Sequence, residues 1–277
     1  MVEYADYEAL SVRVLGGIAT VTIDNGPINL FDRVLYPEMA RLAGELAADD
    51  DVRVVVLCSA NPGWFIAHFD VELILRFPAR PAPTTLSDFH LMCERFRTMP
   101  KATIAVIEGR VGGGGSELAL SCDMRFASLG RAIFNQPEVA LGIIPGGSGT
   151  VRLPRLVGRA RALEAILGSD DIGAATAESW GWVNRALPPA ELWPFVRRLT
   201  TRIAGFPPHA VAEAKASVLR AEGDVHRHLL DEGAAFARAV SEPAARDAME
   251  AFLAGGGQTA EGEARLGDLC GELGSAD

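Results

Sequence analysis

Residues 112–115 are four consecutive glycines, preceded by a short apolar segment and followed closely by a carboxylate, Glu117. Such a run weakens a helix or a strand through backbone entropy, so its presence needs a geometric reason. Either the glycines form a tight turn packed against a neighbouring strand, or they let a ligand approach the backbone. Glu117 also has two interpretations: a favourable partner for the amides at a helix start, or a working acid or base beside an anion site.

The composition is typical of a soluble globular protein. Of the 277 residues, 49% are apolar and 22% are charged. A chain of this length can form one large domain or a domain with an appendage. The formal net charge of −10 argues against a nucleic-acid-binding protein, which would usually be basic. It does not exclude an anionic small molecule, because one segment concentrates positive charge at Arg152, Arg155, Arg159 and Arg161.

The termini and the cysteines predict a cytoplasmic protein. The acidic N-terminus lacks the apolar core of a secretory signal, and no apolar run approaches the length that crosses a membrane. The four cysteines show neither CxxC pairing nor metal-ligand spacing, and Cys58 and Cys122 have the apolar neighbours of buried thiols. His226 and His228 are two residues apart and would lie on different helix faces, so we expect no metal site.

Hydrophobic patterning predicts alternating strands and helices, hence an α/β core. The continuous β-branched run at 52–58 is typical of a strand covered on both faces. Strand–helix spacing is uneven, which does not favour a regular doubly wound sheet. The predicted strands cover residues 17–24, 52–58, 103–107, 123–127 and 132–134, and the predicted helices cover 32–48, 70–76 and 88–98.

The C-terminal part has a different pattern, because it is helical throughout. We predict helices at 210–221, 225–240, 244–253 and 261–273. Residues 77–87 are rich in proline and predict an irregular segment. The expected organisation is a core over 1–205 followed by a C-terminal helical region over 206–277.

Glu138 is a second carboxylate with an unusual setting, because it follows Pro137 and precedes an apolar segment. Two carboxylates in partly apolar surroundings can be tuned to different protonation states and divide acid and base roles. The spacing of Glu117 and Glu138 alone favours the simpler alternative that both are ordinary surface glutamates.

A second glycine cluster, at 146–149, is typical of a loose anion-binding turn before a helix. Neither glycine run fits G-x-G-x-x-G between a strand and a helix, and neither ends in Gly-Lys-Ser/Thr, so a dinucleotide or nucleoside triphosphate site is weakly supported. The sequence Gly147-Ser148-Gly149 also lacks the spacing of a serine hydrolase elbow.

The order and spacing of these segments resemble the crotonase family, the enoyl-CoA hydratase/isomerase superfamily, from about residue 18 to 253. The resemblance is densest at residues 52–57 with 64–70, at 107–123, at 134–150 and at 207–215. It implies a spiral of ββα units and a C-terminal helical region that closes the active site. It also implies homotrimers, often paired into hexamers.

The resemblance implies an acyl-CoA thioester substrate and an oxyanion hole made of two backbone N–H groups. By position in the motifs those donors would be Ile66 and Gly114. Glu117, in Gly-Gly-Gly-x-Glu, would orient and deprotonate a water molecule, and Glu138, in Gln-Pro-Glu, would exchange the proton at the α-carbon. The backbone of Gly146 would help to hold the water.

The same resemblance implies further substrate-binding positions and shows two departures from the family pattern. His68 stands where glycine is common, and we expect it to fill space rather than contact CoA. Residues 254–257 are Ala-Gly-Gly-Gly where relatives often carry Lys or Arg near the CoA phosphates. The implied positions are Ile28, Ala67, His68, Asp70, Gly113, Pro137 and Gly146.

The leading hypothesis is an enoyl-CoA hydratase that adds water to a trans-2-enoyl-CoA and needs no metal or redox cofactor. Retention of both Glu117 and Glu138 favours hydration. The alternatives are an enoyl-CoA isomerase, a pathway-specific relative acting on another acyl group, and a non-catalytic acyl-CoA-binding homologue.

Overall fold

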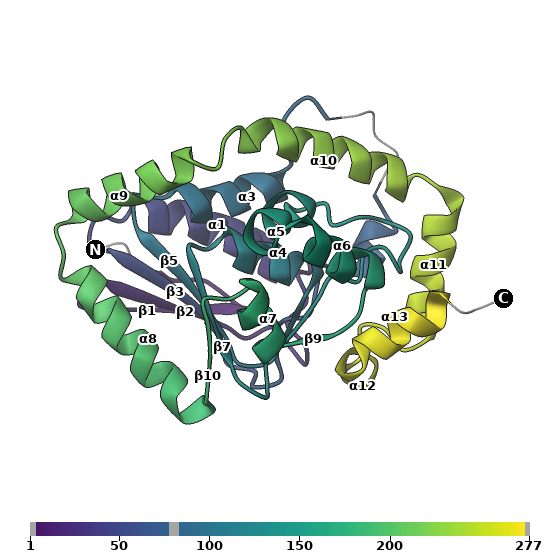
Figure 1. The fold of residues 1–277 in the computed structure, drawn as a ribbon, viewed down its shortest axis with the longest axis horizontal. Helices are drawn as coiled ribbons and strands as arrows, with labels where there is room; N and C mark the ends of the chain where they lie inside the picture. Colours follow the sequence, from purple (N-terminus) through teal and green to yellow (C-terminus); the bar gives the residue numbers. More distant parts are fainter. Residues whose placement is uncertain (1–3, 78–82, 275–277) are drawn as a thin grey trace.

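The structure is a computed structural model that describes residues 4–77 and 83–274 (Figure 1). Its strands form a six-stranded sheet and a four-stranded sheet. The larger sheet has the order β1 (Leu10–Leu15), β2 (Ile18–Ile23), β3 (Val54–Ser59), β5 (Ala102–Ile107), β7 (Met124–Ser128) and β10 (Arg185–Leu187). The smaller has the order β4 (Trp64–Ile66), β6 (Arg110–Gly112), β8 (Ile133–Asn135) and β9 (Ile172–Gly173).

Successive strand pairs divide between the two sheets, which makes the chain a spiral. In β3–β4, β5–β6 and β7–β8, the first strand joins the larger sheet and the second joins the smaller one. Each pair is followed by helix: α2 (Val71–Ile74) with α3 (Asp88–Thr98), then α4 (Gly113–Ser121), then α5 (Gly149–Val157). These repeated ββα units confirm the predicted fold class.

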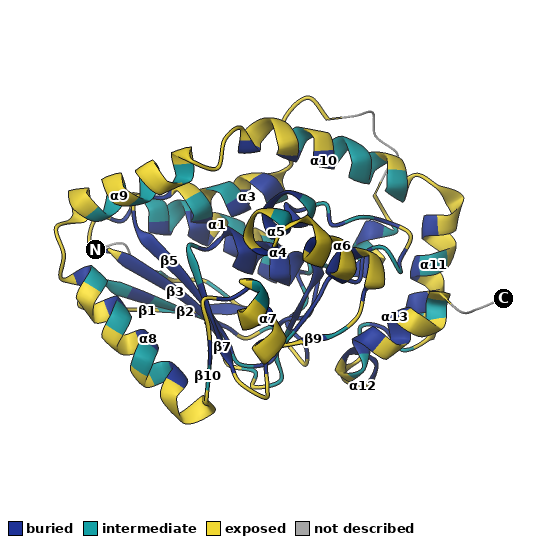
Figure 2. Ribbon diagram, viewed as in Figure 1, coloured by how far each residue is buried: buried dark blue, intermediate teal, exposed yellow. Residues whose placement is uncertain are grey.

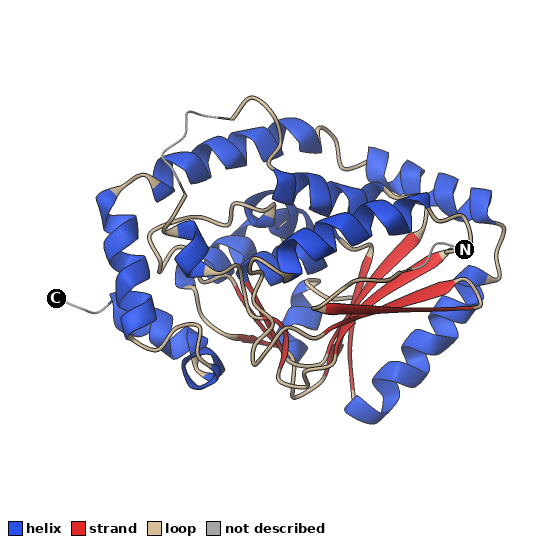
Figure 3. Ribbon diagram, turned by 180° about the vertical axis from the view of Figure 1, so that it is seen from behind, coloured by secondary structure: helices blue, strands red, loops and turns tan. Residues whose placement is uncertain are grey.

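Helices cover both faces of the larger sheet (Figure 3). Val55 and Leu57 of β3 belong to the core cluster that includes Leu42 of α1 (Leu35–Ala48). Val54 and Val56 point to the opposite face and join the cluster that includes residues of α8 (Pro189–Ala204). Burial on both faces explains the uninterrupted β-branched run in the sequence and confirms that prediction.

The C-terminal helices wrap around the outside of the core (Figure 1), and their outward faces are largely exposed (Figure 2). They are α9 (Pro208–Arg220), α10 (Val225–Val240), α11 (Pro243–Ala254), α12 (Ala260–Ala264) and α13 (Leu266–Gly274). The first three confirm the predicted helices, whereas the predicted helix at 261–273 is two short ones that meet at Arg265. The division after residue 205 and the trimer stay predictions.

An aspartate accepts hydrogen bonds from backbone amides near the start of both α1 and α2. Asp32 accepts from the amides of Val34 and Leu35, both at 2.9 Å, in the turn before α1, whose regular helix starts at Leu35 and not at 32. Asp70 accepts from the Glu72 amide at 2.9 Å and is the N-cap of α2, as predicted, but α2 ends at Ile74 rather than at Arg76. Part of the predicted irregular segment, 78–82, lies outside the described residues.

Several elements between residues 149 and 206 have no counterpart among the predictions. They include α6 (Arg159–Gly168), α7 (Ala174–Trp180) and α8. In the part of the chain that the structure describes, the helices are all too short or too polar to cross a membrane.

Candidate active site

Three chain segments converge at one edge of the smaller sheet. Strands β4, β6 and β8 are adjacent and parallel, so the segments that follow them leave the sheet at the same edge. Those segments are 67–70, 113–117 and 136–138. A cavity of about 1030 Å³ opens over them, and α10 forms part of its wall. The fold therefore brings together the sequence motifs that carry both candidate glutamates.

Glu117 is buried in α4, and its carboxylate is held by backbone amides. Only 3% of the residue is exposed. Its Oε1 accepts hydrogen bonds from the amides of Gly147 and Gly149, both at 2.8 Å. Both amides lie at the start of α5, where the helix dipole favours a negative charge. The second glycine cluster thus binds an anion, but that anion is the protein's own carboxylate.

The glycines are needed because the carboxylate and an aromatic ring come very close. A Cβ at Gly147 would lie 2.5 Å from Glu117 Oε2 and 2.4 Å from a ring carbon of Phe89. A Cβ at Gly149 would lie 3.0 Å from Glu117 Oε1. Any side chain at Gly147 would therefore displace the Glu117 carboxylate or the Phe89 ring.

Glu138 lies in the same cavity in a different environment. It is 8% exposed, and its Oε2 has no hydrogen-bond partner among the residues that the structure describes. Burial raises the pKa of Glu138 to about 7, although the positive charge of His68 acts in the opposite direction. A carboxyl group with one unpaired oxygen and a pKa near neutrality is suited to carrying a proton.

Burial also raises the pKa of Glu117 well above its usual value, and the negative charges of Glu138 and Glu232 raise it further. The two amides of Gly147 and Gly149 lower it. The two amides therefore favour the charged form of Glu117, in opposition to burial and to the neighbouring carboxylates.

His68 is buried beside Glu138 and has acceptors at both ring nitrogens. Its Nδ1 lies 2.8 Å from the carbonyl oxygen of Phe69, and its Nε2 lies 2.9 Å from Glu263 Oε1. Burial alone would lower the pKa of His68, but Glu263 and the Phe69 carbonyl reverse this, and the pKa is raised. Because both acceptors need a hydrogen, the geometry describes an imidazolium paired with Glu263 of α12. His68 therefore fastens the C-terminal region to the site.

Gly114 and Phe69 present backbone amides beside the glutamates. Both residues line the cavity, and within residues 4–77 and 83–274 neither amide has a hydrogen-bond acceptor. The His68 carbonyl accepts from the Phe31 amide at 2.9 Å, so the amide of Phe69, in the same peptide unit, points away from Phe31. A Cβ at Gly114 would lie 3.5 Å from Phe69 Cβ, which places the two residues side by side.

Ile66, the other sequence-predicted oxyanion donor, does not line the cavity. It is completely buried in β4, and its carbonyl oxygen would lie 2.4 Å from a Cβ at Gly115. Its side chain packs into the main core cluster. The structure thus brings Gly114 to the cavity, and Phe69 rather than Ile66 beside it.

The remaining predicted positions divide into two groups. His68, Pro137 and Gly146 line the cavity. Gly146 also packs closely against α10, because a Cβ there would lie 2.5 Å from the ring of Phe236. The positions that support the site from outside the cavity wall are Ile28, Ala67, Asp70 and Gly113.

Two functional candidates were missed by the sequence analysis. One is Phe69, whose amide orientation depends on pairing with Phe31. The other is Glu232, a buried acidic residue on the same face of α10 as Leu229 and Phe236, and an acid on an apolar helix face is the signal that could have found it. Arg152, one of the clustered arginines, is buried and pairs with Glu94, so its charge is used within the protein.

Comparison with known proteins identifies the family of this chain. The sequence model of the enoyl-CoA hydratase/isomerase family matches residues 13–255. The short-chain-enoyl-CoA hydratase of Clostridium acetobutylicum is 34% identical over 240 residues, covering 86% of this chain and 92% of that protein. The crotonyl-CoA hydratase of Syntrophomonas wolfei is 34% identical over 210 residues, covering 75% and 80%.

A solved structure from Streptomyces avermitilis, described as a candidate enoyl-CoA hydratase, superposes with a TM-score of 0.90 at 37% identity. The similarity covers 98% of this chain and all of that one. The fold is therefore that of the crotonase class of acyl-CoA enzymes. The chain belongs to the enoyl-CoA hydratase/isomerase family.

Proposed function

We propose that this protein is an enoyl-CoA hydratase, which adds water to a trans-2-enoyl-CoA and forms a 3-hydroxyacyl-CoA. The observation that carries the proposal is the placement of two buried carboxyl groups, Glu117 and Glu138, in one cavity beside two backbone amides that have no partner among the described residues. Two relatives with 34% identity are named as hydratases of enoyl-CoA or crotonyl-CoA.

In the proposed reaction, Glu117 removes a proton from water as the water oxygen bonds to C3 of the substrate. The electrons of the double bond move toward the thioester, whose oxygen becomes an enolate-like oxyanion. Glu138 then donates its proton to C2, which leaves Glu117 protonated and Glu138 ionised, so one proton must pass back before the next turnover. These carboxyl groups supply both acid and base, and the reaction as proposed requires no metal or redox cofactor.

We assign the oxyanion hole to the amides of Gly114 and Phe69. Both residues line the cavity, and their amides have no acceptor among the residues that the structure describes; preorganised donors of this kind are each worth about 3 kcal/mol of transition-state stabilisation. Ile66, expected from the motif, lacks access to the cavity. For the phosphates of CoA, Arg33 supplies positive charge at the cavity wall, whereas Arg76 also lines the cavity but pairs with Glu72.

A panel of trans-2-enoyl-CoA thioesters of increasing length tests the proposal, with products identified by mass in ¹⁸O-labelled water. We expect 3-hydroxyacyl-CoA carrying one labelled oxygen. A shifted double bond without label would instead identify an isomerase. In that reaction the Glu138 oxygen that has no partner among the described residues would carry the proton. Calorimetric binding of the thioesters without any product would identify a non-catalytic acyl-CoA-binding protein.

We also propose that copies of the chain associate as a trimer or hexamer in the cytoplasm. None of the 13 residues of α9 is buried, and Val218 on that helix is 70% exposed. This surface is therefore accessible for contact with a second copy of the chain. The four buried free thiols suit a reducing compartment. Light scattering coupled to size-exclusion chromatography measures the mass, and a monomer would contradict the assembly.

A further inference from the structure

Four successive amides at the start of α5 contact two carboxylates in alternation. The amides of Gly147 and Gly149 donate to Glu117, as described above. Between and after them, the amide of Ser148 donates to Glu232 Oε2 at 2.7 Å, and the amide of Thr150 donates to Glu232 Oε1 at 2.9 Å. Glu117 comes from α4 and Glu232 from α10, so two distant elements hold one short segment.

Glu232 uses both of its oxygens and is only 4% exposed. Besides the two amides, the hydroxyl of Thr150 donates to Oε1, and His90 Nε2 of α3 lies 3.0 Å from Oε2. Desolvating a carboxylate is costly unless hydrogen bonds compensate, and here donors from two other helices do so. A residue placed in this way is not a solvent-facing helix charge.

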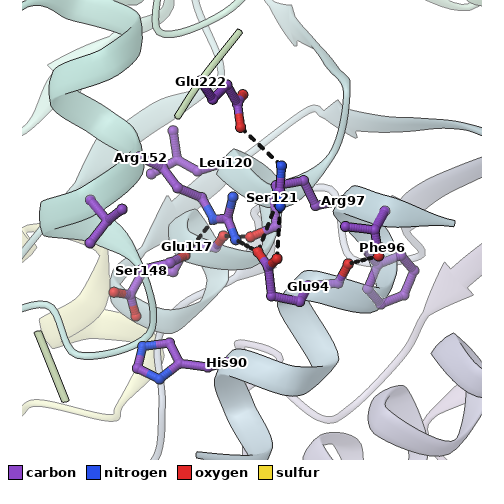
Figure 4. A network of polar contacts seen from close by, with 12 residues as sticks. His90, Glu94, Phe96, Arg97, Glu117, Leu120, Ser121, Ser148, Arg152 and Glu222 are labelled. Atoms are coloured by element: carbon purple, nitrogen blue, oxygen red, sulfur yellow. Dashed lines mark hydrogen bonds and ion pairs between the residues drawn. The ribbon is translucent and has the colours of Figure 1, made fainter. Parts of the chain in front are cut away.

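The segment needs such support because Ser148 has a left-handed backbone, with φ of 106°. That conformation costs a non-glycine residue on the order of 1–3 kcal/mol and persists only when its surroundings enforce it. The Ser148 hydroxyl accepts a hydrogen bond from Arg152 Nε at 2.9 Å. Arg152 in turn pairs with Glu94, which also pairs with Arg97 (Figure 4). The Ser148 hydroxyl is therefore held by Arg152, and the Ser148 amide is held by Glu232.

The face of α10 that carries Glu232 is also the cavity wall. Leu229, Gly233 and Phe236 line the cavity from the same helix. The position of α10 over the substrate site is thus coupled, through one side chain, to the segment that holds Glu117.

We propose that Glu232 is a positioning residue for Glu117. By fixing the amides of Ser148 and Thr150, it keeps the neighbouring amides of Gly147 and Gly149 aimed at the Glu117 carboxylate. This inference rests on the proposed function in so far as turnover uses Glu117, but the geometry that it describes can be measured without a substrate.

Glu232 also acts on Glu117 through its charge. The groups that face Glu117 are Glu138 from the segment after β8, Glu232 from α10, the Cys93 thiol from α3 and the two amides of α5. The negative charge of Glu232 raises the pKa of Glu117. Removing that charge lowers the pKa, so the base form of Glu117 persists to lower pH.

The first test compares Glu232→Gln with Asp231→Asn, which makes the same charge change on an exposed neighbour in α10. The new glutamine side chain would turn an NH₂ group toward one of the two amides, so at least one contact is lost. We expect kcat for crotonyl-CoA to fall about tenfold or more with KM within about twofold, since small misplacements of a catalytic group cost this much. The acid limb of the pH profile should move, to lower pH where loss of the charge dominates and to higher pH where loss of the Gly147 and Gly149 amides dominates, and Asp231→Asn should match the wild type. A folded Glu232→Gln protein with wild-type kcat and acid limb would overturn the proposal.

The second test needs no turnover: hydrogen exchange of the backbone amides in peptides spanning residues 146–150, followed by mass spectrometry. Exchange should be faster in Glu232→Gln than in Asp231→Asn. If no thioester is converted, the proposed function fails while faster exchange still supports the positioning role. Where Glu232→Gln does not fold, Glu232→Asp, whose shorter side chain withdraws the carboxylate from the amides of Ser148 and Thr150, takes its place, and wild-type exchange in that variant contradicts the proposal.

Discussion

The cavity contains two glutamates, one in each half, and their surroundings are opposite in character. In one half, Glu117 accepts two backbone hydrogen bonds, and Glu232 holds the segment that supplies them. In the other half, Glu138 has an oxygen without a partner among the described residues and lies beside the imidazolium of His68. The first environment fixes a carboxylate in place, and the second leaves a carboxyl group free to exchange a proton.

The comparison shows that the C-terminal helices take part in both halves. Glu232 of α10 reaches the Glu117 half, and Glu263 of α12 reaches the Glu138 half through His68. Each candidate catalytic glutamate is therefore supported by a buried glutamate from the end of the chain. A region that looks like an appendage in the sequence completes the electrostatics of the site.

The largest expected effect comes from removing the fixed carboxylate. Glu117→Gln keeps the shape but loses the base, and one amide of Gly147 or Gly149 then faces an NH₂ group. We expect kcat for hydration to fall about 10³- to 10⁴-fold, the upper range for a general base. Steady-state kinetics with crotonyl-CoA measures this, with Glu164→Gln as an exposed control. Activity within tenfold of the wild type would remove Glu117 from its assigned role.

Glu138→Gln removes the proton that Glu138 is proposed to donate to C2 of the substrate. We expect kcat to fall about 10²- to 10³-fold. In the wild type the proton-donating form of Glu138 is lost as pH rises through its pKa of about 7, so kcat/KM should decline above that pH. The residual activity of Glu138→Gln should lack this alkaline limb. An unchanged limb in the variant would assign the titration to another group.

His68→Gln removes the cation that joins the Glu138 half to α12 and leaves Glu263 buried with an unbalanced charge. Breaking a buried pair in this way costs about 3 kcal/mol of stability. Because the folded pKa of His68 is raised, its contribution is fully present below the unfolded value near 6.5 and is lost as pH rises through the folded value.

Urea unfolding at pH 6 and pH 9 measures this contribution. The gap between wild type and His68→Gln should be larger at pH 6. His209→Gln, at an exposed position, should change stability by less than about 0.5 kcal/mol at either pH. An equal gap at both pH values would mean that His68 is neutral and acts by packing alone.

The parts of the site that the sequence predicted are those encoded in short local motifs. Glu117, Glu138 and Gly114 follow directly after strands, and parallel strands deliver their ends to one edge, so proximity follows from order and spacing. Most of the long strands and helices were found because they extend over enough residues to show a period, but α6 and α8 were missed although they are just as long. Strands such as β6 and β9 have too few residues for any period to appear.

The parts that were not predicted depend on contacts between distant residues. Which amide of the 66–70 loop faces the cavity is set by its bridge to Phe31, and no local pattern distinguishes Ile66 from Phe69. The roles of Glu232 and Glu263 depend on how α10 and α12 dock, because each acts on a residue far away in the sequence.

Gly147→Ala tests whether the Glu117 half depends on close packing. The added Cβ meets both the carboxylate and Phe89, so either group must move by about an ångström. We expect kcat to fall about 30-fold, or ~2 kcal/mol, with a small loss of stability.

Gly44→Ala is the matched control, because a Cβ there meets nothing within 4 Å and alanine suits the middle of α1. The control should keep wild-type kcat and gain up to about 1 kcal/mol of stability. Because Glu138 is not among the nearest atoms that a Cβ at Gly147 meets, the alkaline limb should persist in Gly147→Ala. Its disappearance would show that the two halves do not act separately.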